Sequence, residues 1–302
     1  MVKFTFEGLM APVFTAFTEQ NELNVDIVPA YAEFLAKNGV KSILVNGTTG
    51  EGIQMSTEER KANLEAWMKV SARHSFTVMV QIGGTAFVEV LKLAKHAAHL
   101  NVHALLCLPE LFFYPQSDSQ LVQYLADVSH AAPNVPLFYY HIPQFTRIVF
   151  DMELFTRKCV ADIPSFCGIK FTHTNLEELQ RMNKVDPERL TFFLGCDQLI
   201  LPGLVCGINS HINTSLSLFP NTLNKICTAY KQGNLETARE SQDQLTDVLK
   251  QITAYGSWMS SLKPNMKFIT GLDFGSVRKP LEPLPPQIVA KLKAHVDTFL
   301  AL

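Results

Sequence analysis

The sequence has few of the features that mark secreted, membrane-bound or metal-binding proteins. Its six cysteines form no C-x-x-C pair and do not cluster with histidine, which argues against a dense disulfide framework and against a metal site. No segment reaches about 18 uninterrupted apolar residues, and the first residues lack the apolar core of a signal peptide. These absences predict a cytosolic protein with reduced thiols and no membrane partner.

An excess of charge of one sign is also missing. The 26 lysine and arginine residues nearly balance the 28 aspartate and glutamate residues, giving a net charge of −2, and no basic run is present. Nucleic acids and anionic membranes attract clustered positive charge, so neither is expected as a partner. The 302 residues, 47% of them apolar, suit an ordinary globular protein, with room for one barrel of about 250 residues and extra helices.

Short apolar runs recur at regular intervals along the first two thirds of the chain. Their hydrophobicity is continuous rather than alternating, which is typical of parallel strands that are covered on both faces. The eight runs are residues 9–14, 42–46, 76–82, 104–108, 136–140, 168–171, 191–194 and 210–213.

Helical patterns separate these runs. Ser56 and Glu59 form a capping box before a helix that extends to about His74, and further helices begin at Ser117 and Asn175. Strands alternating with helices predict a (β/α)8 TIM barrel over residues 1–218. Residues 219–302 are expected to form a C-terminal helical extension, packed on the barrel in one structural unit. Its predicted helices are 221–231, 234–254, 258–270 and 286–300.

A lysine interrupts the sixth apolar run, Gly168-Ile169-Lys170-Phe171. Burial penalises a charged ammonium group, and the neutral amine that burial favours is a nucleophile toward carbonyl carbons. Thr172, two residues later, should face the same side of the strand. The alternative is a lysine at a strand end whose head group reaches solvent.

The loop Gly47-Thr48-Thr49-Gly50-Glu51-Gly52 follows the second run. Its glycines allow a tight turn in which successive amides and the hydroxyls of Thr48 and Thr49 point at one spot, a geometry suited to a carboxylate or phosphate. A plain turn would have the same composition.

Two tyrosines and a histidine close the fifth run, in Tyr139-Tyr140-His141. A tyrosine beside a neutral lysine can relay protons through its phenol, whereas the alternative for Tyr140 is a core aromatic residue. We expect a structural role for His141.

Polar residues follow the last two runs at the same predicted mouth of the barrel. Gly195, Asp197 and Gln198 come after the seventh run and Thr214 after the eighth, where they could hydrogen-bond the hydroxyls of a polyol substrate. Asp197 could instead cap the following helix.

Three motifs in this order and spacing resemble the N-acetylneuraminate lyase and dihydrodipicolinate synthase superfamily: Gly47–Glu51, Tyr140–Pro143 and Gly168–Thr172. The resemblance covers essentially the whole chain. It implies a class I aldolase on a (β/α)8 barrel with a C-terminal helical region, with no cofactor other than the lysine itself. By this resemblance Lys170 forms a Schiff base with a keto acid, Tyr140 moves protons, and the Thr48–Thr49 pair holds the pyruvyl carboxylate.

The position that distinguishes the branches of this superfamily is Phe145. Dihydrodipicolinate synthases have an arginine there, which holds a second substrate carboxylate, so its absence favours the N-acetylneuraminate lyase branch. That branch cleaves N-acetylneuraminate reversibly to pyruvate and N-acetylmannosamine.

Two positions depart from the lyase pattern on the sugar side. Gln198 stands where glutamate is usual, and Asn213 stands where glycine is usual. Two alternatives therefore stay open: a pyruvate-dependent aldolase for another 2-keto-3-deoxy sugar acid, and a catalytically silent sialic-acid-binding homologue. The resemblance also implies a homotetramer, in which Tyr114 contributes to the neighbouring subunit's site.

Overall fold

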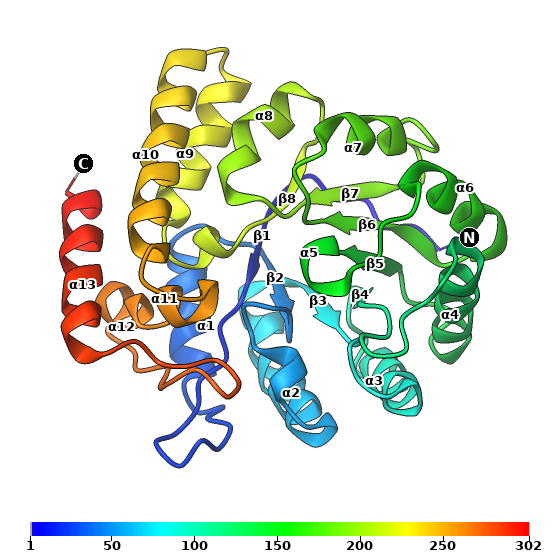
Figure 1. The fold of residues 1–302 in the computed structure, drawn as a ribbon, viewed down its shortest axis with the longest axis horizontal. Coiled ribbons are helices and arrows are strands. Elements are labelled where there is room, and N and C mark those ends of the chain that lie inside the picture. The colour runs from blue at the N-terminus through cyan, green and yellow to red at the C-terminus, as the bar shows by residue number, and fades with distance from the viewer. Residues whose placement is uncertain (1, 302) are drawn as a thin grey trace.

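The computed structural model describes residues 2–301, so Met1 and Leu302, the outer ends of the two predicted regions, lie outside it. Eight parallel strands form a closed barrel in the order β1 to β8, as predicted (Figure 1). The strands are β1 Gly8–Pro12, β2 Ser42–Val45, β3 Thr77–Gln81, β4 Ala104–Cys107, β5 Leu137–His141, β6 Phe166–Phe171, β7 Thr191–Leu194 and β8 Ser210–Ile212.

Helices connect consecutive strands and surround the barrel. The predicted capping box is present: the Ser56 hydroxyl accepts from the amide of Glu59, whose carboxylate accepts from the amide of Ser56. Ser117 and Asn175 also cap the helices that they were predicted to begin. The α-helices are α1 Val28–Lys37, α2 Thr57–His74, α3 Phe87–His99, α4 Asp118–Ala131, α5 Pro143–Thr146, α6 Met152–Asp162, α7 Leu176–Asn183 and α8 Ile200–Val205, and the short 3-10 helices are η1 Gly52–Gln54, η2 Asp197–Leu199 and η3 Thr214–Ser217.

Two hydrophobic clusters hold the barrel together. The larger lies between the strands and the surrounding helices, and the smaller fills the barrel interior with residues such as Met10, Leu106 and Phe193. Phe4 and Phe6 pack against this inner cluster, with the Phe4 and Phe138 ring centroids 5.2 Å apart. The N-terminal segment therefore closes one end of the barrel and leaves chemistry to the other.

Helices also make up most of the chain after the barrel. They are α9 Pro220–Lys231, α10 Leu235–Thr253, α11 Trp258–Leu262, α12 Asn265–Thr270 and α13 Pro286–Leu300. The prediction of one helix over 258–270 was wrong, because the chain forms two helices on either side of Lys263 and Pro264. Pro264 has no amide hydrogen to donate, so it interrupts the helical hydrogen bonds. Helix α10 packs against both α9 and α13.

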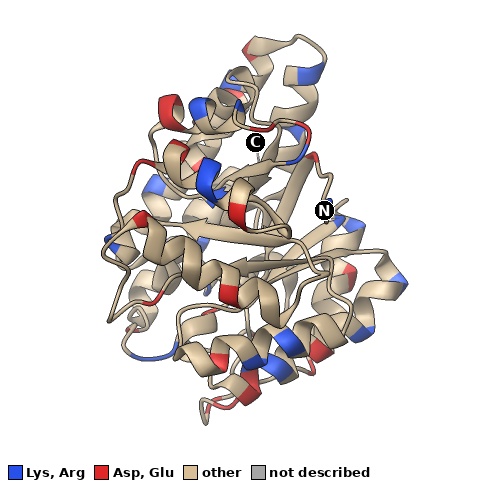
Figure 2. Ribbon diagram, turned by 90° about the vertical axis from the view of Figure 1, so that its right-hand side faces the viewer, with Lys and Arg blue, Asp and Glu red and all other residues tan. Residues whose placement is uncertain are grey.

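The surface and the cysteines are unremarkable for a globular chain. Basic and acidic residues are interspersed over the outer helices on the face that Figure 2 shows. All six cysteines are free, and within residues 2–301 no group of three or more acidic, histidine or cysteine side chains is arranged to hold a metal ion. In that same range no helix combines the length and the apolar character that a bilayer span requires.

Candidate active site

Lys170 and Tyr140 are neighbours at the carboxyl ends of adjacent strands. They are register partners between β5 and β6, and the Lys170 Nζ lies 4.1 Å from the centroid of the Tyr140 ring. Lys170 is only 4% exposed and Tyr140 only 2%, so the lysine does not extend into solvent. An amine held against an aromatic ring in a largely dry site is suited to nucleophilic attack once it is neutral.

A bulge in β6 decides which way Lys170 points. Leu137 pairs with Phe166, but the next residue of β5, Phe138, pairs with Gly168, so β6 holds one extra residue. Phe166 and Ile169 both belong to the outer cluster, although side chains three positions apart would face opposite sides of a regular strand. The extra residue therefore turns Lys170 toward the barrel interior.

Gly168 makes this bulge possible. Its φ of 142° lies in a region that side-chain-bearing residues rarely adopt, and a Cβ there would lie 1.8 Å from the carbonyl oxygen of Thr191. The glycine two residues before the lysine is therefore required by the backbone.

The Gly47–Gly52 loop contacts the hydroxyl end of Tyr140. The Thr48 Oγ1 lies 3.1 Å from the Tyr140 hydroxyl, and the Thr49 Oγ1 lies 2.9 Å from the Thr214 Oγ1. Within residues 2–301, the amides of Thr48 and Thr49 donate to no other backbone carbonyl. The loop is a tight, largely buried turn that presents the Thr48 and Thr49 hydroxyls and, within the described residues, two free amides beside Tyr140, the arrangement that a carboxylate needs.

Glycine is required at Gly52 of this loop and is tightly packed at Gly50. A Cβ on Gly52 would lie 1.9 Å from the Asn46 carbonyl oxygen, and one on Gly50 would lie 3.0 Å from the Val13 carbonyl oxygen. The turn is thus packed directly on backbone, which leaves it little freedom to shift.

Thr172 and Gly195 are also brought together. A Cβ on Gly195 would lie 2.2 Å from the Thr172 Oγ1, so the glycine makes room for the threonine. That hydroxyl is buried and has no hydrogen-bond partner among the described residues. Both residues follow strands at the mouth, as predicted, and the Thr172 hydroxyl is left without a protein partner there.

Asp197 connects the loops after β7 and β8. It is 4% exposed, and its carboxylate accepts from the Ser215 amide at 2.8 Å and from the Ser215 hydroxyl. It does not cap the helix that follows it, so that alternative was wrong; its carboxylate instead accepts from the first turn of η3. Burial raises the pKa of Asp197, while the Ser215 donors and the charge of Lys170 act in the opposite direction.

The two residues that depart from the lyase pattern lie in different surroundings. Gln198 is exposed, so its amide is accessible. Asn213 is 1% exposed, and in the described part of the chain neither its Oδ1 nor its Nδ2 has a partner.

Sequence reasoning missed Trp258, which reaches the site from helix α11. Its Nε1 donates to the Thr214 Oγ1 at 3.3 Å, so it supports the hydroxyl that Thr49 contacts. The available signal was that Trp258 is one of only two tryptophans in the chain and directly follows Ser257, a residue type that often begins a helix.

His141 and Tyr114 lie apart from these contacts. His141 is buried against Phe171, with ring centroids 5.1 Å apart, and burial together with neighbouring His173 lowers its pKa to about 3. It is therefore a neutral packing residue, as expected. Tyr114 is 41% exposed in the loop after β4, and in residues 2–301 its hydroxyl bonds none of the site residues.

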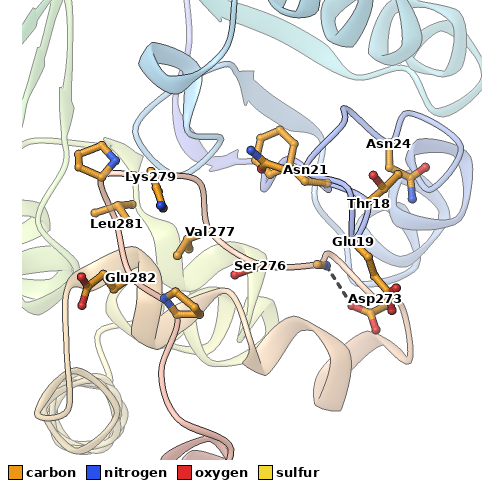
Figure 3. Close-up of a pocket in the computed structure, with 14 residues that line it drawn as sticks. Thr18, Glu19, Asn21, Asn24, Asp273, Ser276, Val277, Lys279, Leu281 and Glu282 are labelled. Carbon is orange, nitrogen blue, oxygen red and sulfur yellow. Dashed lines mark hydrogen bonds between the residues drawn. The ribbon is translucent and has the colours of Figure 1, made fainter.

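A wide groove of about 1020 Å³ lies elsewhere on the molecule (Figure 3). It runs between the segment after β1, which includes Thr18 and Asn24, and the segment before α13, which includes Lys279 and Glu282. None of the site residues lines it.

Comparison with known proteins agrees with this geometry. The model of the dihydrodipicolinate synthetase family matches residues 5–298. N-acetylneuraminate lyase of Gallus gallus is 31% identical over 97% of this chain and 96% of its own, and N-acetylneuraminate lyase A of Xenopus laevis is 32% identical over 91% and 90%. The solved structure of Proteus mirabilis N-acetylneuraminate lyase superposes with a TM-score of 0.94 at 28% identity, covering 99% of this chain and all of its own. This chain belongs to the dihydrodipicolinate synthetase family.

Proposed function

We propose that this protein is a class I aldolase that reversibly cleaves N-acetylneuraminate to pyruvate and N-acetylmannosamine. The observation that carries the proposal is the buried Lys170 in register with Tyr140, whose hydroxyl lies 3.1 Å from Thr48. The family match and the N-acetylneuraminate lyases among its relatives support the choice of reaction. Phe145, which is 65% exposed, supports it too, because no arginine is present there for a second carboxylate.

Lys170 is the proposed nucleophile. Its neutral amine attacks the C2 keto carbon of the open-chain substrate, and uptake of a proton with loss of water leaves a protonated imine; the final hydrolysis returns that proton. When the C3–C4 bond breaks, the iminium accepts the electron pair and becomes an enamine. Protonation at C3 and hydrolysis of the imine then release pyruvate and regenerate the amine.

Tyr140 is the proposed proton carrier. As the C3–C4 bond breaks, the phenol takes up the proton of the C4 hydroxyl and passes its own proton to C3 of the enamine, so the aldehyde product leaves neutral. The Thr48 hydroxyl at 3.1 Å orients the phenol and offers it a partner while the proton moves.

The two sides of the mouth divide the recognition of the substrate. The free amides and the hydroxyls of Thr48 and Thr49 receive the carboxylate next to the keto group. Thr172, Gly195, Asp197, Gln198 and Thr214 form the side that faces the sugar hydroxyls. Of these, Thr172 offers an unpaired hydroxyl and Gln198 an accessible amide.

The reaction is tested by trapping and by turnover. Borohydride reduction in the presence of pyruvate, followed by peptide mass spectrometry, should find a reduced pyruvyl adduct on Lys170. A coupled assay should detect pyruvate from N-acetylneuraminate, and Lys170→Met should abolish both signals while remaining folded. Absence of an adduct on folded wild-type protein would refute the Schiff-base mechanism.

A substrate panel tests the identity of the sugar. Turnover should be greatest with N-acetylneuraminate among 2-keto-3-deoxy sugar acids. Trapping of pyruvate without cleavage of any sugar acid would contradict the lyase assignment and favour a silent binding protein.

The proposed assembly is a cytosolic homotetramer. Six free thiols suit a reducing compartment. Phe112 and Phe113, next to Tyr114, are 82% and 85% exposed, an apolar surface that a second subunit would bury. Light scattering of the purified protein should give four times the chain mass of 33.8 kDa, and Phe113→Asp should reduce it. A wild-type monomer would refute this assembly.

A further inference from the structure

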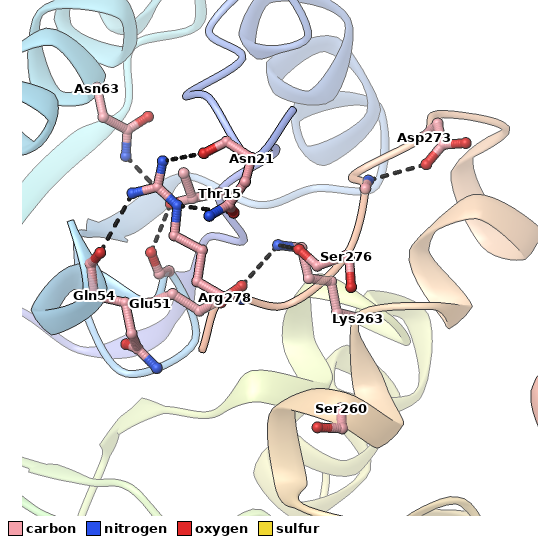
Figure 4. A network of polar contacts seen from close by, with 12 residues as sticks. Thr15, Asn21, Glu51, Gln54, Asn63, Ser260, Lys263, Asp273, Ser276 and Arg278 are labelled. Atoms are coloured by element: carbon pink, nitrogen blue, oxygen red, sulfur yellow. Dashed lines mark hydrogen bonds and ion pairs between the residues drawn. The ribbon is translucent and has the colours of Figure 1, made fainter. Parts of the chain in front are cut away.

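Behind the Gly47–Gly52 loop lies a buried charged network that the reaction does not use (Figure 4). The Lys263 Nζ lies 2.7 Å from a carboxylate oxygen of Glu51, and both side chains are at most 1% exposed. The second carboxylate oxygen of Glu51 accepts from the backbone amide of Arg278 at 2.7 Å. Glu51 is therefore held by two residues more than two hundred positions later in the chain.

The residues that hold Glu51 are themselves fixed. Lys263 also donates to the Ser276 carbonyl at 2.8 Å, which ties the segment before α13 to the end of α11. The Arg278 guanidinium donates to both carboxylate oxygens of Glu59 and to the Asn21 carbonyl. The Arg278 contacts cross between the barrel and the chain after it, so the network joins the two regions (Figure 4).

Both cations also pack on one aromatic ring. The Lys263 Nζ and the Arg278 guanidinium carbon lie 4.3 Å and 4.0 Å from the centroid of Phe17. This arrangement fixes the two cations relative to the chain that follows β1.

Glu51 has an unusual backbone conformation that these contacts stabilise. Its φ is 51°, in the left-handed region that a glutamate adopts only at a cost. Two residues earlier lie the amide and hydroxyl of Thr49, and the Glu51 amide donates to the Thr48 carbonyl. The bond from the Glu51 amide to the Thr48 carbonyl therefore fixes the peptide plane that carries the Thr49 amide.

A second contact runs from the same C-terminal region to the same loop. Trp258 donates to the Thr214 hydroxyl, which contacts the Thr49 hydroxyl. The contacts of Glu51 thus fix the backbone of the loop, and the contact of Trp258 with Thr214 fixes the Thr49 hydroxyl.

We propose that Glu51, Lys263 and Arg278 are positioning residues, through which the chain after the barrel holds the Thr48–Thr49 turn in the shape that receives the substrate carboxylate. The inference rests on the proposed role of that turn in carboxylate binding. An ion pair that served only stability would have no reason to end on the turn whose amides are free. Misplacing binding groups by a small distance weakens binding strongly, because each hydrogen bond depends on direction.

The test is a double substitution, Glu51→Met with Lys263→Met. Replacing a buried ion pair by apolar side chains of similar volume is often nearly neutral for stability, so this variant should fold. We expect the KM for N-acetylneuraminate, and the pyruvate concentration that half-saturates borohydride trapping, to rise about 10-fold, while kcat changes less than about threefold. Lys263→Met alone should lower the melting temperature further, because it leaves the Glu51 carboxylate buried without its cation.

A milder variant and a matched control complete the experiment. Arg278→Lys keeps the charge but loses the two-pronged contact with Glu59, so it should raise KM less than the double variant does. Arg189→Met removes hydrogen bonds to the Val160 and Ile163 carbonyls, far from the loop in sequence, and should lower the melting temperature with KM unchanged.

Two outcomes separate this inference from the proposed function. If wild-type protein is trapped by pyruvate but KM and trapping are unchanged in the double variant and in Arg278→Lys, the positioning role is refuted and the network is structural. If folded wild-type protein is not trapped at all, the proposed function itself fails.

Discussion

The hydrogen bond between Thr48 and Tyr140 leads to a sharp prediction about the proton carrier. Thr48→Val preserves the shape of the side chain but removes the hydroxyl that lies 3.1 Å from the phenol. A neutral hydrogen bond contributes about 1 kcal/mol, which corresponds to a loss of about fivefold in kcat through poorer orientation of Tyr140. The same hydroxyl is a proposed donor to the substrate carboxylate, and losing a bond to a charged group should raise KM by about 10-fold or more.

Two further variants separate these effects. Thr48→Ser keeps the hydroxyl and should resemble wild type in both parameters. In a Tyr140→Phe background the phenol is absent, so Thr48→Val should no longer lower kcat but should still raise KM. The assay is pyruvate release under steady-state conditions, with borohydride trapping as the measure of carboxylate binding. Equal activity of Thr48→Val and Thr48→Ser, or a full kcat loss in the Tyr140→Phe background, would refute the reasoning.

Two further predictions concern stability. Gly168→Ala should lower the free energy of unfolding by about 3 kcal/mol or more, because its Cβ would meet the Thr191 carbonyl oxygen at 1.8 Å and its φ is 142°. Gly207→Ala, with φ of 80° and no described atom within 4 Å of the new Cβ, should cost only about 1 kcal/mol, and equal losses in urea denaturation would contradict the clash. Burial lowers the pKa of His211 to about 4, so between pH 6.5 and 4 this histidine is protonated in the unfolded state but neutral in the folded one. The free energy of unfolding should therefore fall by up to about 1.4 kcal/mol for each unit by which the pH is lowered in that range. His211→Gln should reduce this slope in urea denaturation across that range, and an identical slope would count against it.

The barrel was predictable because each strand has its own local sequence signal. A continuous apolar run bounded by polar residues can be recognised without the rest of the chain. All eight runs are strands, and their ends differ from the prediction by at most two residues. The helix starts at Ser56 and Ser117 were equally local, since one side chain and an amide three residues later decide them. The interruption at Pro264 was visible in the sequence, but the prediction gave it too little weight.

The site residues likewise divide into those that have a local sequence signal and those that do not. Lys170 and Tyr140 each carry a local signal, and the order of parallel strands brings the two together. The partnership of Glu51 with Lys263 spans 212 positions and has no sequence signature, because a lysine beside a proline between two helices is ordinarily exposed. Likewise, nothing in the sequence around Asp197 indicates that its carboxylate accepts hydrogen bonds from Ser215 and not from the helix that follows Asp197.

A deletion in a strand usually disturbs the orientation of later side chains more than a substitution does, and the bulge in β6 reverses this order for Lys170. Deleting one residue between Phe166 and Ile169 would restore a regular strand in which Lys170 still faces the interior, since the extra residue is what offsets the alternation. A substitution that suppresses the bulge while keeping the length would instead bring Ile169 to the mouth and turn the lysine toward the helices. At this point in the chain a deletion keeps Lys170 directed toward the barrel interior. A single methyl group added at Gly168 can turn Lys170 away from it.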